Sequence, residues 1–224
     1  MEIEHTPNFS VVATDGSARL GELSMERHSL ETPTFMPVGT RGAVRTLTSS
    51  DLKELGADIV LGNTYHLMLR PGVETIQLLG GLHGFTGWER LILTDSGGYQ
   101  VFSLEPDVDD LGATFKSTYD GSLHRLTPKG AVDIQCGLGA DIQMTLDVCP
   151  PLPSEKSVIE TAVARTKLWA EDAREHFLLK RENEKFAGAQ FGIVQGGLDL
   201  SLRRISGEQI VDIGFDGYAV GGLS

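Results

Sequence analysis

The sequence predicts an α/β fold in which parallel strands form a (β/α)8 TIM barrel that is incomplete at its carboxyl end. Short apolar strands alternate with amphipathic helices, as in parallel sheets joined by right-handed crossovers. In a barrel all strands deliver their carboxyl ends to one face, whereas a doubly wound sheet binds ligands at a switch point between adjacent loops. The predicted strands end in polar or glycine-rich residues, which favours the barrel: Asn63, Asp95, Asp147, Gln195 and Gly222.

The length of the chain accounts for the incomplete barrel. The 224 residues accommodate five or six βα units, whereas an eight-stranded barrel usually needs about 250 residues or more. A barrel that lacks two units would expose two sheet edges. We therefore expect residues 1–224 to form a single domain that is the N-terminal part of a longer protein.

Composition restricts the function classes. The chain has 19 Lys and Arg against 31 Asp and Glu, a net charge of −12, which repels phosphate backbones at long range. A nucleic-acid surface must then be local or lie outside these residues. There is no membrane-spanning apolar run and no basic-then-apolar leader, so a cytoplasmic protein is expected. Two cysteines, Cys136 and Cys149, are too few for a disulfide framework or a structural zinc site.

The first 40 residues precede the repeating units. Strands at 9–13 and 19–23 are expected to form a leading β-hairpin, because the Asp15-Gly16 pair between them is a strong hairpin turn. The prolines within 32–38 favour an extended segment over a helix.

Helix caps and apolar runs define the units that follow. Thr48 and Asp51 form an N-cap pair, and Gly56 ends the helix that they begin. The later elements rest on the same signals and are expected as a strand at 58–61, a helix opened by Pro71 and closed by Gly80-Gly81, a strand at 91–93, an inserted hairpin at 112–126, a helix at 127–138, a strand at 141–146, a helix from 154 past 177, a strand at 189–194, a helix at 200–213 and a strand at 218–220.

Two further expectations concern surfaces. The acidic residues at 105–110 and along 155–184 are expected on solvated faces. The long helix is expected to carry its apolar residues on one side: Val158, Ala162, Trp169 and Ala173.

The stretch 91–104, LILTDSGGYQVFSL, carries the strongest functional signal. Its apolar start predicts a strand buried on both faces, which Asp95 follows. Gly97 and Gly98 let bare backbone N–H groups approach a ligand, and Tyr99 offers an aromatic face. This arrangement suits a flat polar ring beside an acid/base group. The alternative is a tight turn in which Asp95 accepts hydrogen bonds from local amides.

Asp95 and Asp147 stand at the ends of two predicted strands. Two carboxylates are typical of sites that cleave a bond to an anomeric carbon. One carboxylate transfers the proton, and the other stabilises the developing oxocarbenium charge. The spacing does not show which of the two carboxylates has which role. For Asp147 the alternative is that its side chain caps a turn. Gln195 can form hydrogen bonds with the edge of an amide-bearing ring or with the backbone of its own loop. Gly221 and Gly222 can present backbone groups to a ligand, cradle a phosphate or form plain turns.

The other reactive side chains give weaker signals. Cys149 is expected to line a pocket rather than act as a nucleophile, because no histidine lies in a partnering motif. Cys136 is expected to pack within a helix, and His66 could reach the pocket rim from the end of its strand. No GxGxxG or P-loop motif is present.

Four motifs in register, TDSGGYQVFSL, LDVCPP, GIVQGG and YAVGGLS, closely resemble the bacterial tRNA-guanine transglycosylases, or queuine tRNA-ribosyltransferases, and PTFMPVGT and LGNTYHL support the match. The resemblance implies a (β/α)8 barrel with a zinc-binding insertion and a homodimer. It also implies a glycosyltransferase of queuosine biosynthesis, which exchanges the wobble guanine of a tRNA anticodon for a 7-deazaguanine, in bacteria the 7-aminomethyl form.

The resemblance also implies roles for individual residues. Asp95 would be the general acid/base, and Tyr99 would stack on the flat ring. Asp147 would accept hydrogen bonds from the N–H edge of the base, while Gln195 and the Gly222 backbone would read its carbonyl side. Val148 stands where the resemblance implies Glu, so the sequence departs from the family pattern at this position. The full set of implied base-pocket residues is Asp95, Ser96, Gly97, Gly98, Tyr99, Asp147, Cys149, Gln195 and Gly222.

By the same resemblance, the nucleophilic aspartate, the zinc ligands and most of the basic tRNA-binding surface lie beyond Ser224. No metal ligand is expected within this chain, and these residues alone are not expected to form the covalent ribosyl intermediate. Two rival functions stay open: a phosphate-binding barrel isomerase or lyase that uses Gly221-Gly222, and a non-catalytic partner subunit of a transglycosylase. The intact sequence around Asp95 argues against the second rival.

Overall fold

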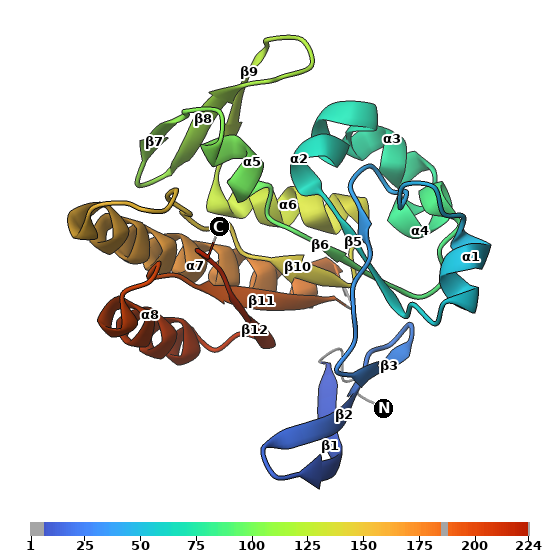
Figure 1. The fold of residues 1–224 in the computed structure, drawn as a ribbon. Coiled ribbons are helices and arrows are strands. Elements are labelled where there is room, and N and C mark those ends of the chain that lie inside the picture. Colours follow the sequence, from blue (N-terminus) through green and yellow to red (C-terminus); the bar gives the residue numbers. More distant parts are fainter. Residues whose placement is uncertain (1–6, 185–187, 224) are drawn as a thin grey trace.

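The protein is described by a computed structural model at residues 7–184 and 188–223. Its centre is a six-stranded sheet (Figure 1) in which neighbouring strands are parallel and follow one another in chain order. In order across the sheet the strands are β4 (Val38–Gly39), β5 (Ile59–Gly62), β6 (Leu91–Thr94), β10 (Ile142–Met144), β11 (Ala189–Val194) and β12 (Gly217–Val220). The parallel α/β fold is confirmed, and the sequential strand order is compatible with a barrel. Within the described residues the sheet is open, with β4 and β12 at its edges.

Helices follow the strands as the alternating pattern predicts. They are α1 (Ser49–Glu54), α2 (Thr64–Leu67), the π-helical turn η1 (Met68–Gly72), α3 (Val73–Leu78), α4 (Gly81–Thr86), α5 (Gly98–Phe102), α6 (Pro128–Leu138), α7 (Lys156–Glu184) and α8 (Leu200–Ile213). Helix α7 packs between α6 and α8 and against β11 (Figure 1). None of the helices in the described part of the chain is both long and apolar enough to cross a membrane.

The buried face of α7 is partly as predicted. Trp169 and Ala173 are fully buried, as expected. The prediction for Val158 is wrong, because this side chain is 45% exposed and its neighbour Ile159 is 7% exposed. With 3.6 residues per turn, Ile159 rather than Val158 shares the helix face of Ala162 and Trp169.

The segment between β5 and β6 also differs from the prediction. Asn63 lies at the end of the strand, and its side chain accepts a hydrogen bond from the His66 N–H at 3.0 Å. This N-cap starts α2 at once, so no loop separates strand from helix. Gly81 begins α4 instead of closing the preceding helix, because Gly80 takes a left-handed conformation at its N-cap.

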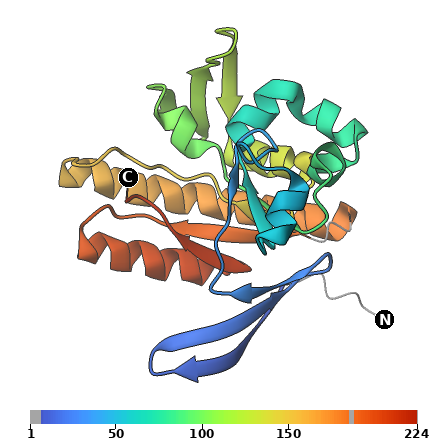
Figure 2. The same ribbon diagram turned by 45° about the vertical axis from the view of Figure 1, so that its right-hand side comes forward.

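Both predicted hairpins gain a third strand. The leading sheet contains β1 (Asn8–Asp15), β2 (Ala18–Ser24) and β3 (Ser29–Thr32), and the inserted sheet contains β7 (Asp107–Asp109), β8 (Gly112–Lys116) and β9 (Leu123–Leu126). The two small sheets lie at opposite ends of the molecule (Figures 1 and 2). The acidic residues at 105–110 are exposed, as predicted, and part of this run also forms the strand β7.

The sheet buries an apolar cluster on one face. Side chains from β5, β6, β10 and β11 meet there, namely Ile59, Leu91, Leu93, Ile142, Met144, Ala189 and Ile193. The polar residues that follow these strands lie at the carboxyl edge above this cluster. The cluster thus supplies an apolar floor for any cavity at that edge.

Candidate active site

Four loops from separate strands meet at the carboxyl edge of the sheet. Asp147, after β10, is contacted by the Ser96 hydroxyl at 3.4 Å and by Gln195 Nε2 at 2.5 Å. Ser96 follows β6 and Gln195 follows β11. Gly222, after β12, lies against Gln195 so closely that a Cβ there would overlap Gln195 Oε1. The structure therefore brings the residues that follow these four strands together.

Asp95 is held by the start of α2. One carboxylate oxygen accepts the Asn63 Nδ2–H at 2.6 Å, and the other accepts the N–H groups of Thr64 and Gly97 at 2.9 and 3.0 Å. Burial disfavours the charged form more than these three hydrogen bonds favour it, and the pKa of Asp95 rises to about 6. A carboxyl group with such a pKa can accept and return a proton near neutral pH.

Asp147 is also buried, with 8% of its surface exposed. Burial raises the pKa of Asp147 to about 6, against the hydrogen bonds from Gln195 and Ser96, and the neighbouring charge of Asp95 raises it further. The two carboxyl groups differ in their partners, since Asp95 is bonded largely by backbone N–H groups and Asp147 by side chains.

A cavity of about 410 Å³ opens beside both carboxyl groups, a size typical of small-molecule sites. Its polar wall comes from the segment between β6 and the first turn of α5 and from the loop after β10: Asp95, Ser96, Gly97, Gly98, Tyr99, Gln100 and Asp147. Its apolar wall consists of Met36, Leu61, Leu93, Met144, Phe191, Ile193, Tyr218 and Ala219. Such a cavity can hold a flat ring whose polar edge meets the carboxyl groups.

The loop that carries Tyr99 requires glycine. Gly97 has a φ of +76°, and a Cβ there would lie 3.0 Å from the Tyr65 backbone nitrogen. The tight turn places Tyr99 in the first turn of α5, where its side chain lines the cavity and is 59% exposed. The aromatic face is thus accessible to a ligand.

Three of the predicted site residues do not line this cavity. Gln195 is 1% exposed and lies behind Asp147, while its Oε1 has no hydrogen-bond partner among the described residues. Gly222 packs on Gln195, and Cys149 is half-buried outside the cavity wall. His66 does not line the cavity either, and its Nδ1 is hydrogen-bonded to the Tyr119 hydroxyl at 2.8 Å.

Arg203, on α8, is a site residue that sequence reasoning missed. Its guanidinium donates to the carbonyls of Gly197, Val194 and Gly222 at 2.8, 3.1 and 3.2 Å. These bonds join the loops after β11 and β12 and so fix the relative position of Gln195 and Gly222. An arginine within an amphipathic helix gives no sequence signal for such a role.

Within residues 7–184 and 188–223, no group of three or more His, Cys, Asp or Glu side chains is arranged to hold a metal ion. The described residues therefore do not fit a zinc site.

The fold and the site together define a parallel α/β protein with two buried carboxyl groups beside one cavity at the carboxyl edge of its sheet. Residues 14–224 match the sequence model of the family described as queuine tRNA-ribosyltransferase. Accordingly, the chain belongs to the queuine tRNA-ribosyltransferase family.

Curated proteins named queuine tRNA-ribosyltransferase are similar to nearly the whole chain. The protein from Thermotoga neapolitana is 52% identical over 217 residues, which are 96% of this chain and 57% of that protein. The proteins from Zymomonas mobilis and Ruegeria sp. are each 49% identical over 219 residues, 97% of this chain and 56% and 57% of those proteins. The chain thus spans a little over half the length of the curated relatives that it matches.

Proposed function

We propose that this chain supplies the base-binding and acid/base part of a tRNA-guanine transglycosylase, a glycosyltransferase that exchanges the wobble guanine of a tRNA anticodon for a 7-deazaguanine in queuosine biosynthesis. The observation that carries the proposal is the pair of buried carboxyl groups, Asp95 and Asp147, beside one cavity. The names of the relatives support it.

In the proposed reaction the bond between the ribose carbon and the base nitrogen breaks. Asp95 in its protonated form gives its proton to the departing guanine, and its carboxylate takes a proton from the incoming base. The pKa of about 6 keeps both forms accessible near neutral pH. The nucleophile that would hold the ribose between these steps is proposed to lie beyond Ser224.

The base would lie in the cavity against Tyr99, with its N–H edge toward Asp147. Backbone groups of Gly97 and Gly98 and the Ser96 hydroxyl would complete the polar wall. Gln195 would position Asp147 through the hydrogen bond from its Nε2. The remaining residues that the resemblance implies, Gly222 and Cys149, lie outside the cavity wall, and Gly222 would act through its contact with Gln195.

Further properties of the whole protein are proposed on family membership. They are tRNA as partner, a 7-aminomethyl-7-deazaguanine substrate, a homodimer, cytoplasmic location and a structural zinc whose ligands lie beyond Ser224. A phosphate-binding isomerase or lyase fits the site less well, because the Gly221 N–H already donates to the Val194 carbonyl at 2.9 Å.

The test uses Asp95→Asn in the full-length protein. Guanine exchange into tRNA should be abolished, because the amide cannot transfer the proton, while the far-UV circular dichroism and melting temperature stay near those of the wild type. Asp212→Asn is the matched control, since Asp212 is an exposed carboxylate on α8. Normal exchange by Asp95→Asn would contradict the assigned role.

A further inference from the structure

Two arginines lie over one tyrosine ring near the carboxyl edge of the sheet. The guanidinium carbons of Arg41 and Arg70 are 5.5 and 5.1 Å from the centroid of the Tyr119 ring. Arg41 follows β4, Arg70 belongs to η1 and Tyr119 lies in the turn between β8 and β9. Three segments that are distant in sequence therefore form what we call the Arg–Tyr cluster, defined as Arg41, Arg70 and Tyr119.

The charges of this cluster are not neutralised within the described residues. Neither Arg41 nor Arg70 forms a salt bridge there, and both side chains are exposed. Other arginines of the chain do pair with carboxylates: Arg27, Arg90, Arg125, Arg165, Arg174, Arg181 and Arg204. Two neighbouring unpaired cations on a chain of net charge −12 form a local site that an anion would complete.

The turn that carries Tyr119 is held in position by the start of α2. The Tyr119 hydroxyl is hydrogen-bonded to His66 Nδ1 at 2.8 Å. The Tyr65 hydroxyl accepts the Thr118 N–H at 3.1 Å and lies 3.0 Å from the Thr118 hydroxyl. The aromatic ring is thus oriented before any ligand binds.

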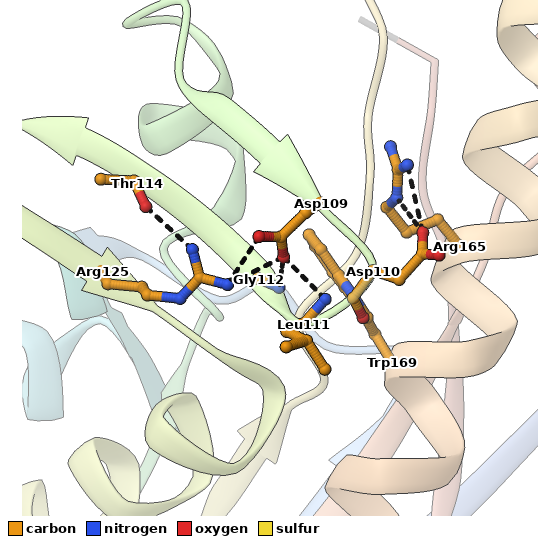
Figure 3. Close-up of polar contacts among 8 residues, drawn as sticks. All are labelled: Asp109, Asp110, Leu111, Gly112, Thr114, Arg125, Arg165 and Trp169. Atoms are coloured by element: carbon orange, nitrogen blue, oxygen red, sulfur yellow. Dashed lines mark hydrogen bonds and ion pairs between the residues drawn. The ribbon is translucent and has the colours of Figure 1, made fainter.

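The opposite end of the inserted sheet is attached to α7, as Figure 3 shows. The Trp169 indole donates to the Asp110 carbonyl at 2.9 Å, and Arg165 forms an ion pair with the Asp110 carboxylate at 3.2 Å (Figure 3). Within the sheet, the Arg125 guanidinium donates to both oxygens of Asp109 at 2.8 and 2.9 Å. Attachment at both ends makes the insert a fixed platform, which lowers the entropic cost of binding.

The same short helix connects the cluster to the candidate active site. Asn63 and Thr64, at the start of α2, bind the Asp95 carboxylate, and His66, two residues after Thr64, binds Tyr119. One helical turn rises only about 5 Å. A ligand on the Arg–Tyr cluster would therefore lie close to a base held beside Asp95.

We propose that the Arg–Tyr cluster binds a phosphodiester group of the tRNA, adjacent to the nucleotide whose base enters the cavity. This inference rests on the proposed function. Guanidinium groups bind phosphate through paired N–H donors, and the half-buried Tyr119 ring holds both guanidinium groups in place. Because the cluster is joined through α2 to the cavity that would take a tRNA base, RNA rather than an acidic protein surface is the favoured partner.

The test compares full-length Arg41→Gln/Arg70→Gln with Arg19→Gln. Arg19 is an exposed arginine in the leading sheet at the other end of the molecule (Figure 2). Guanine exchange and equilibrium tRNA binding are measured over a range of salt concentrations. We expect the double variant to bind tRNA about tenfold more weakly, with the salt slope reduced by roughly 0.7 for each arginine removed. The KM for guanine and the kcat should stay within about twofold of the wild type.

Several results would overturn the proposal. Unchanged tRNA binding and salt slope would mean that no phosphate is bound at the cluster. An equal rise in the KM for guanine would place the effect in the base cavity, and a change in oligomeric mass would identify a protein contact instead. Weaker tRNA binding by the double variant, together with a wild type that performs no exchange, would refute the proposed function while supporting the cluster.

Discussion

The contact between Gly222 and Gln195 leads to a quantitative prediction. Gly222 has a φ of +67°, and a Cβ there would overlap Gln195 Oε1. In Gly222→Ala the left-handed conformation costs about 1–2 kcal/mol of folding free energy. The overlap also displaces the Gln195 amide from Asp147, a hydrogen bond to a charged group worth about 1.5–3 kcal/mol. If that bond orients Asp147 for the base, the KM for guanine should rise about 10-fold to 100-fold.

A matched glycine separates backbone strain from the overlap. Gly56 has a φ of +76°, and nothing lies within 4 Å of where its Cβ would be. Gly56→Ala should therefore lose only the strain contribution, about 1–2 kcal/mol in urea unfolding, and keep the KM for guanine. Both variants are assayed in the full-length protein by guanine exchange into tRNA. If Gly222→Ala kept the wild-type KM, or Gly56→Ala raised it equally, the assigned role of Gln195 would be refuted.

The other predictions concern Asp147 and Arg203. Because folding raises the pKa of Asp147 to about 6, its protonated carboxyl group favours the folded state. This contribution to the free energy of unfolding is fully present below the pKa that Asp147 has in the unfolded chain, and it is lost as pH rises through about 6. Between pH 4.5 and 7, urea unfolding should show the wild type losing about 2 kcal/mol more than Asp147→Asn, and equal losses would contradict this burial effect. Arg203→Lys cannot reproduce the three-carbonyl contact, so the KM for guanine should rise at least about tenfold. Arg204→Lys, on the exposed side of α8, should leave the KM for guanine unchanged.

The main elements of the fold could be predicted because their signals are local. The strand at Ala189–Val194 and the helix at Leu200–Ile213 occur with the predicted bounds. Thr48 and Asp51 form the predicted capping box. The third strand of each small sheet was missed, because short polar segments such as Asp107–Asp109 become strands only when a partner strand lies beside them.

The candidate site was predictable in position more than in contacts. Asp95 and Asp147 were identified because each follows an apolar strand, and the parallel sheet brings such ends together. Whether Gln195 lines the cavity or lies behind Asp147 depends on packing across three strands, which periodicity does not encode. Arg203 was missed for the same reason, since its partners are backbone carbonyls of two separate loops.

The order of strands and helices and the polar chemistry at the strand ends follow from the amino-acid sequence alone, because apolar periodicity and caps act within a few residues along the chain. Which of those groups meet, how deeply they are buried and where unpaired charge gathers depend on the folded arrangement of the strands and helices. Burial raises the pKa values of Asp95 and Asp147, and convergence of distant segments places Arg41 and Arg70 over Tyr119. Both effects depend on distances through space that no local pattern specifies.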